Sequence, residues 1–317
     1  MVELQKKIIN SRLSIPLTIL LIIGLRLHAG VDLLSPIPVA VLLIHIGIAF
    51  SLFFMNHSFN IIRRKTTLPS IFFLLTTGTN AYYFTNLTAS VITLLIILCL
   101  ICTFASYRNP DSQRYLFNIS ILLSVGALLW LPAIFFLPLF WLSFIQFKAF
   151  NGKSLLASLL GILLVLLFVF TWAVYEGNPE NILQKLLAYR NLFPADLDTW
   201  SSIEIVRALY IAALSIISLI YLMRNLYSEK IKSQTILFHL YIFFMVTMIG
   251  AVFFFSEKYI FCSMLYLFAS LIISYLFTLF HKKFVACLLL FSLLFYISTY
   301  FIAYYETILS ELYYGSF

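Results

Sequence analysis

Charged residues are scarce in this chain: Asp, Glu, Lys and Arg make up 10% of its 317 residues, whereas 63% are hydrophobic. Soluble domains are about 25% charged and about 45–50% apolar. A globule of this size cannot bury so much apolar surface, so the composition excludes a soluble domain. The sequence therefore predicts an integral membrane protein, an all-α bundle of transmembrane helices.

Cysteine is rare, and familiar catalytic motifs are missing. Cys99 and Cys102 form a C-x-x-C in an apolar run with no second cysteine pair or histidine nearby, which favours two helix residues over a zinc or redox site. The sequence has no Walker-type loop, no G-x-S-x-G and no H-E-x-x-H. Cofactors and metals therefore stay unknown at this stage.

Linkers, charge runs and repeats are also missing, so we expect one transmembrane domain over 1–317. The first apolar stretch has no clear cleavage site, which favours an uncleaved first helix. A spanning helix needs ~20 apolar residues, and about eleven runs qualify. They lie near 13–29, 36–55, 70–85, 87–106, 117–130, 132–147, 155–175, 208–223, 235–255, 259–280 and 284–304.

The apolar run 117–147 is too long for one upright helix. Pro132 and Pro138 interrupt it, and proline removes a backbone hydrogen bond and clashes with the preceding turn. We expect two short helices that meet near Trp130, with one long kinked helix as the alternative.

The positive charges are distributed unevenly over the predicted loops. With the N-terminus inside and eleven spans, fifteen of the twenty Lys and Arg residues fall on inner segments and nine of the twelve acids on outer ones. Cytoplasmic loops collect Lys and Arg, so this predicts a bacterial inner-membrane protein with a cytoplasmic N-terminus and a periplasmic C-terminus. The basic charge then needs no nucleic acid partner.

The longest connection, 176–207, is predicted on the outer face. Pro179 suits a first helical position, and the apolar residues that follow share one face, which predicts an amphipathic segment 179–190 in the membrane interface. It either caps the bundle or forms the rim of a cavity. Ser201 and Glu204 predict a capping box that starts the next span.

Candidate site residues gather on the same predicted face. Arg26 and His28 end the first span and Asp32 follows in a short loop. A charge at the depth of Arg26 costs about 2–3 kcal/mol if unpaired. It either closes the loop as an ion pair with Asp32, or it contacts a phosphate while Asp32 acts as a general base or metal ligand. Further candidates for substrate binding are Glu176, Arg190, Asp196, Asp198, Glu257 and Lys258.

Asp196 and Asp198 are spaced so that their hard oxygens could bind a divalent metal, although two acids alone match weakly. Inside the spans the polar residues are sparse, with His45, Asn80 and His239 the most notable. No acid, Lys or Arg is predicted at mid-membrane depth, which counts against a proton- or sodium-coupled transporter.

Two stretches carry a resemblance to a known family. The run LLSVGALLWLPAIFFLPLFWLSFIQFKAFNGKSLLASLLGILLVLLFVF is a proline-broken helical hairpin that leads into a span containing Gly161. With CSMLYLFASLIISYLFTLFHKK near the C-terminus, it resembles an uncharacterised family of multi-spanning inner-membrane proteins of Bacteroidota. That resemblance implies no activity and no functional residues.

A looser resemblance is to membrane glycosyltransferases that use polyprenyl-phosphate sugars. It rests on the multi-span bundle, on Asp32 after the first span and on the amphipathic outer segment, and it implies a catalytic role for Asp32. The chain departs from that family in its very short first outer loop, 30–35.

The sequence thus favours a protein that handles a lipid-linked glycan or another amphipathic lipid at the outer leaflet, with glycosyltransferase-like activity as one form. The implied partners are the lipid bilayer, a polyprenyl-phosphate-linked sugar and other envelope proteins. The alternative is a non-catalytic scaffold or accessory subunit of an envelope complex. A facilitator or flippase is third, and it predicts a continuous polar path past His45 and Asn80.

Overall fold

The protein is described here as a computed structural model. It covers residues 11, 13–31, 35–109, 111–176, 200–225, 230–254, 257–279 and 283–314, with side chains as far as 306. Over these residues the chain forms eleven α-helices and two short 3-10 helices, and no strand. The all-α prediction is therefore confirmed.

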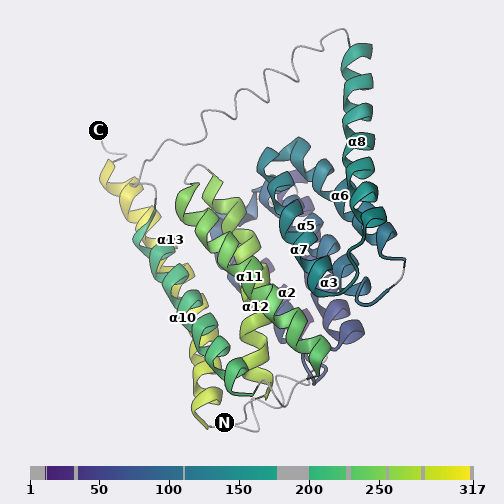
Figure 1. Ribbon diagram of the computed structural model, residues 1–317. Helices are drawn as coiled ribbons and strands as arrows, with labels where there is room; N and C mark the ends of the chain where they lie inside the picture. Colours follow the sequence, from purple (N-terminus) through teal and green to yellow (C-terminus); the bar gives the residue numbers. More distant parts are fainter. Residues whose placement is uncertain are drawn as a thin grey trace. The chain divides into compact units, whose positions relative to one another are not determined.

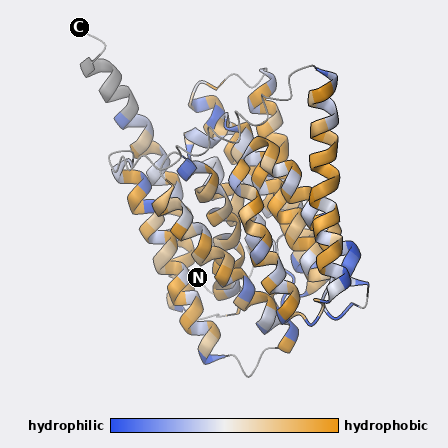
Figure 2. Cartoon of the chain, turned by 45° about the horizontal axis from the view of Figure 1, so that its top comes forward, coloured by the Kyte–Doolittle hydropathy of each residue, from blue (hydrophilic) through white to orange (hydrophobic). Residues whose placement is uncertain are grey.

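The helices are apolar along most of their length and hydrophilic mainly towards their ends (Figure 2). Their bounds are α2 (Ser14–His28), α3 (Pro36–Phe59), α4 (Leu68–Gly78), η1 (Ala81–Phe84), α5 (Leu87–Ala105), α6 (Ser112–Leu129), η2 (Leu131–Phe136), α7 (Leu137–Gln146), α8 (Gly152–Tyr175), α10 (Ser202–Arg224), α11 (Ile231–Phe253), α12 (Lys258–Leu279) and α13 (Lys283–Tyr314) (Figure 1).

Seven of these helices are long and apolar enough to cross a membrane, namely α3, α5, α8, α10, α11, α12 and α13. Shorter apolar helices are α2, α4 and the η2–α7 segment. The chain is thus a multi-pass membrane protein. Each of the eleven predicted runs overlaps one or two of these helices, but the number of helices that cross the membrane stays a prediction.

The predicted span 70–85 is wrong as one helix, because α4 ends at Gly78. The hydroxyls of Thr76, Thr77 and Thr79 donate to carbonyls one turn earlier, at 2.9, 2.8 and 2.7 Å. Asn80 then adopts an extended backbone and its side chain accepts from the Tyr82 N–H at 3.2 Å, which starts η1. Every residue of α4 is buried, so its threonines lie in the protein interior.

Two other local features follow the sequence. Trp130 has an extended backbone between α6 and η2, where the two-helix reading of 117–147 places the break. At the start of α10, the Ser201 N–H donates to a Glu204 carboxylate oxygen at 3.2 Å, which confirms the predicted capping box.

The chain divides into two compact units, each built from segments far apart in the sequence. Unit 1 comprises Met1–Leu87, Asp198–Glu229 and Tyr266–Phe317, and unit 2 comprises Thr88–Leu197 and Lys230–Leu265. In unit 1, α4 packs against α2 and α3; in unit 2, α6 packs along α8. The single domain over 1–317 stays a prediction.

Candidate functional site

Arg26, in the last turn of α2, is completely buried in unit 1. Its Nη1 donates to the Pro38 carbonyl at 3.0 Å and its Nη2 donates to His45 Nδ1 at 3.4 Å. The guanidinium carbon lies 5.0 Å from the ring centroid of Phe84, at cation–π distance. The arginine predicted from sequence is therefore held by α3 and η1.

The acceptors of Arg26 are neutral. A guanidinium stays protonated and only donates, so His45 Nδ1 must accept. The imidazole is then the neutral form with its proton on Nε2. His45, singled out above as an intramembrane polar residue, therefore orients Arg26 without cancelling its charge.

One donor of Arg26 is left over. Its Nε is buried and has no hydrogen-bond partner among the described residues. A buried donor without a partner loses its hydration with nothing in return. Asp32, the counter-ion suggested by the sequence, lies outside the described residues.

A second buried arginine lies at the same end of unit 1. Arg207, in the second turn of α10, has 3% of its surface exposed. Its Nε donates to Thr299 Oγ1 at 3.0 Å and its Nη2 donates to the Thr79 carbonyl at 2.9 Å. Thr79 follows α4, where carbonyls lack helical donors. Arg207 thus joins α10, α13 and the end of α4.

The surroundings of Arg207 are phenolic, with one acid nearby. Tyr83, Tyr266, Tyr296 and Glu204 all lie within electrostatic range of its guanidinium. Glu204 accepts from the backbone at the start of α10. In the part of the chain that the structure describes, the hydrogen bonds of Arg26 and Arg207 go to carbonyls, a hydroxyl and an imidazole, not to carboxylates.

Tyr296, on α13, also has an unused polar group, as does Tyr210 on α10. It is 1% exposed, and its hydroxyl has no hydrogen-bond partner among the described residues. Thr299 and Tyr300 follow one turn later on the same helix face. Tyr296 therefore shares a face with Thr299, which binds Arg207.

His28, the other candidate from the first span, docks α2 onto α13. The Tyr300 hydroxyl donates to the Leu25 carbonyl at 2.8 Å, and His28 Nδ1 lies 3.1 Å from that hydroxyl oxygen. Because the phenol proton is used, His28 is the donor of the second bond. Its ring lies 4.6 Å from the Tyr304 ring. These contacts give His28 a structural role beside Arg26.

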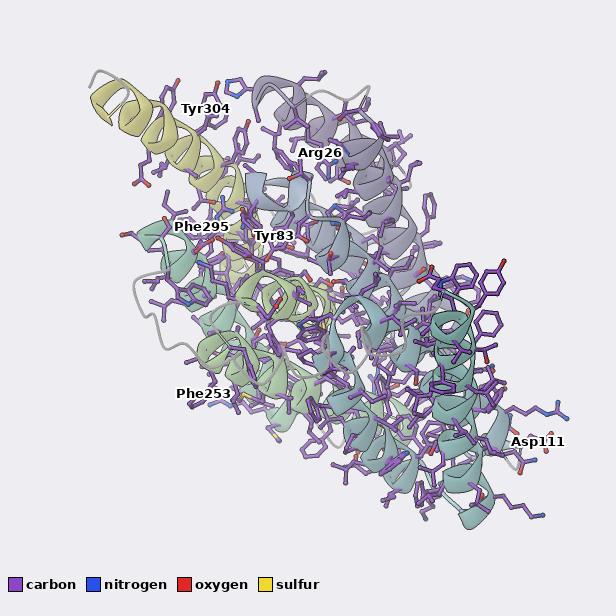
Figure 3. All side chains as sticks on the ribbon, turned by 90° about the horizontal axis from the view of Figure 1, so that it is seen from above. Arg26, Tyr83, Asp111, Phe253, Phe295 and Tyr304 are labelled. Carbon is purple, nitrogen blue, oxygen red and sulfur yellow. The ribbon has the colours of Figure 1, made fainter. Side chains whose placement is uncertain are left out.

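Arg26, Arg207 and Tyr296, which we call the arginine cluster, lie on three helices of unit 1, and the two arginines are close to helix ends. Arg26 is two residues before the end of α2 and Arg207 five residues after the start of α10, which is about 3 Å and about 8 Å of helix rise. Figure 3 looks onto the molecule from above and labels Arg26, Tyr83 and Tyr304 on the elements that form the cluster. The charge distribution predicts that this end faces outward.

Three of the remaining predicted residues are also described. Glu176 is exposed at the end of α8, where one carboxylate oxygen accepts from Trp172 Nε1 at 2.8 Å. Glu257 directly precedes α12, and burial raises the pKa of its carboxyl. Lys258 is the first residue of α12, and its Nζ lies 4.7 Å from the Tyr259 ring centroid. These three residues belong to unit 2.

The other predicted residues are Arg190, Asp196 and Asp198, and they lie outside the described residues together with the segment 179–190. Their convergence with Arg26 stays a prediction. Within the described ranges no group of three or more His, Cys, Asp or Glu residues is placed to hold a metal ion. Cys99 and Cys102 are unbridged thiols on α5.

Sequence reasoning missed Arg207 and Tyr296 as site residues. Arg207 was not predicted as a site residue, although a base in the second turn of an apolar helix is the same signal that drew attention to Arg26. Nothing in the sequence separates Tyr296 from the other 18 of the 19 tyrosines.

Comparison with known proteins gives no relative: the chain matches no family model, no curated protein and no solved structure.

Proposed function

We propose that the protein binds the anionic headgroup of an amphipathic lipid at the outer end of unit 1, and that it handles such a lipid, of the lipid-linked glycan class, at the outer leaflet. The observation that carries the proposal is Arg26, a fully buried cation whose hydrogen bonds go to neutral acceptors and whose Nε has no partner among the described residues.

The energetics favour a ligand over a packing role. A guanidinium that is buried in protein without an anion loses hydration that neutral acceptors only partly replace, and methionine would fill much of the same space without that loss. Phosphate oxygens satisfy a guanidinium through short, charge-assisted and often bidentate hydrogen bonds. A bound phosphate would therefore offset both the charge and the unused Nε donor.

The depth of the site favours a lipid over a soluble anion. Arg26 lies about 3 Å of helix rise from the end of α2, and in our proposal this end of the helix lies where hydrocarbon gives way to headgroups. A lipid whose tail stays between the helices and the bilayer places its phosphate at that level.

The 3-10 helix η1 covers Arg26. Tyr82 is 47% exposed, whereas Tyr83 and Phe84 are buried, with Phe84 stacked on the guanidinium. At the start of this four-residue turn the Asn80 side chain accepts from the Tyr82 N–H. In our proposal the headgroup reaches Arg26 by displacing η1, which moves one short turn and leaves the long helices in place.

A catalytic step is a further part of the proposal. If the lipid is a glycosyl donor, Asp32, directly after α2 in the sequence, acts as the base. Asp32→Asn would then abolish sugar transfer to a hydroxyl acceptor and leave lipid binding intact.

One observation favours the scaffold instead. Arg26 and Arg207 together join α2, α3, η1, α10, α13 and the end of α4, and a purely structural arginine pair would do the same. A scaffold predicts that stability falls when Arg26 is replaced and that no phosphate lipid binds.

The test is lipid binding by the purified protein in nanodiscs, measured as a thermal shift against increasing prenyl monophosphate. Arg26→Gln removes the charge at the site. Arg224→Gln removes an exposed charge at the opposite end of α10 in the same unit and serves as the control.

We expect the wild type and Arg224→Gln to bind the probe, and Arg26→Gln to bind more than about tenfold more weakly, which is about 1.4 kcal/mol. Equal binding by all three proteins, or binding by none, would refute the proposal and favour the scaffold.

A further inference from the structure

The cluster contains a second cation that one phosphate does not compensate. Arg207 is nearly as buried as Arg26, and its hydrogen bonds also go to uncharged oxygens, of Thr79 and Thr299. Glu204 lies within electrostatic range of Arg207, and its carboxylate accepts from the Ser201 N–H. A single phosphate at Arg26 would leave the second guanidinium without an anion in hydrogen-bond contact.

Tyr296 adds an independent observation. Its hydroxyl is buried without a partner among the described residues, within electrostatic range of Arg207. Phenylalanine, which the chain uses 33 times, would fill this position without an unsatisfied hydroxyl. A phenol O–H is a good donor to a phosphate oxygen. The unused hydroxyl therefore points to an acceptor supplied by a ligand.

The two arginines reach neighbouring points on the same elements. Arg26 stacks on Phe84, while Arg207 lies in range of Tyr83, the residue before it. On α13, Thr299 accepts from Arg207, and the next residue, Tyr300, binds α2 at Leu25. Consecutive residues of η1, and consecutive residues of α13, thus lie beside Arg207 and beside Arg26 or its neighbour Leu25, so both cations belong to the same end of unit 1.

We infer that the lipid handled here is linked through a diphosphate, with one phosphate at Arg26 and the other at Arg207 and the Tyr296 hydroxyl. This inference rests on the proposed function and sets its substrate class. A diphosphate presents anionic oxygens on two adjacent phosphorus atoms, so it supplies an anion to each guanidinium and an acceptor to the phenol.

The test compares farnesyl diphosphate with farnesyl monophosphate, which share one tail, on the full-length protein in nanodiscs. We expect the wild type to bind the diphosphate at least about tenfold more tightly. Tyr296→Phe and Arg207→Gln should reduce the ratio of diphosphate affinity to monophosphate affinity towards one. Both variants should keep a monophosphate affinity close to that of the wild type. Inorganic diphosphate should bind much more weakly than either lipid.

Tyr296→Phe keeps the test valid if Arg207→Gln fails to fold. Arg207→Gln breaks bonds to two elements, whereas Tyr296→Phe removes a hydroxyl with no bond to lose among the described residues. Its thermal stability without ligand should equal or exceed that of the wild type. The matched controls are Tyr221→Phe and Arg224→Gln, at the opposite end of α10, which should keep the wild-type ratio.

The outcomes separate the two proposals. If the wild type binds both lipids equally, or if Tyr296→Phe keeps the full preference, the diphosphate inference is wrong and the proposed function stands. If neither lipid binds, the proposed function is wrong and the inference with it. If inorganic diphosphate binds as tightly as the farnesyl form, the ligand is a soluble anion, which overturns both.

Discussion

Two sets of buried polar side chains, one in each unit, differ in how completely their hydrogen-bonding groups are used. In unit 2, Thr93 Oγ1 and Ser263 Oγ lie 2.7 Å apart, so one hydroxyl donates to the other, and the accepting hydroxyl can donate its own proton to a carbonyl of its own helix. In unit 1, Arg26 and Tyr296 keep donors without partners among the described residues. The first set joins helices and is complete by itself, whereas the second contains more hydrogen-bonding capacity than packing uses. In our proposal, this unused capacity is where the lipid headgroup binds.

The largest expected effect tests whether unit 2 depends on close packing. A Cβ at Gly161 of α8 would lie 2.9 Å from the Phe117 carbonyl oxygen and 2.9 Å from Ser120 Cβ on α6. Because backbone cannot move aside cheaply, Gly161→Ala should lower the free energy of unfolding by about 1–3 kcal/mol. Thermal unfolding in detergent measures this. Gly152→Ala, with open space around the Cβ, should not destabilise, and equal effects would contradict the prediction.

Replacing Arg26 should have the opposite sign. Arg26→Met removes a buried charge that lacks an anion, so the ligand-free protein should gain about 1–2 kcal/mol of stability while it loses lipid binding. The measurement pairs thermal unfolding without ligand with the monophosphate titration. A loss of stability of similar size would show that Arg26 is structural, and the contrast between the units would disappear.

The complete contact of unit 2 should contribute a smaller amount. Thr93→Val and Ser263→Ala, measured singly and together, form a double-mutant cycle across α5 and α12. Hydrogen bonds between membrane helices average about 0.6 kcal/mol, and we expect a coupling free energy of that order. A coupling of zero would mean that the hydroxyl pair does not hold the two helices.

The smallest effect concerns Glu257 of unit 2. Burial raises the pKa of this carboxyl above its ordinary value of 4.5, so the folded state keeps the proton to higher pH than the unfolded state does. The associated stability is fully present below about 4.5 and is lost as pH rises through the folded pKa. Glu257→Gln should flatten this part of the curve of melting temperature against pH. An unchanged slope would refute the assignment.

Much of the helical framework could be predicted, because apolar runs, prolines and caps act locally. Trp130 breaks the helix beside Pro132 as expected, and Ser201 with Glu204 starts α10. The prediction failed at α4, where threonine hydroxyls that bond their own helix allow a short buried helix that hydropathy reads as a weak span.

Only part of the candidate site could be predicted from the sequence. Arg26 stands out because a charge near the end of an apolar run needs an explanation. Its actual acceptors, on α3, and the bond from Arg207 to Thr79 across 128 residues depend on tertiary packing, which no local pattern encodes. Tyr296 became notable only once its hydroxyl was seen to be buried and unused.

The shortness of α4 has a consequence for how the protein is made. Its 11 residues rise about 16 Å, against about 30 Å of hydrocarbon, so a translocon would not insert it as an independent span. It enters the bilayer together with its neighbours. The Thr79 carbonyl at its end accepts from Arg207, which in turn donates to Thr299. Both Arg207 and Thr299 leave the ribosome much later than Thr79. The hydrogen bonds of Arg207 to Thr79 and Thr299 are therefore among the last contacts to form during synthesis, and chains interrupted before α13 would lack the bond to Thr299.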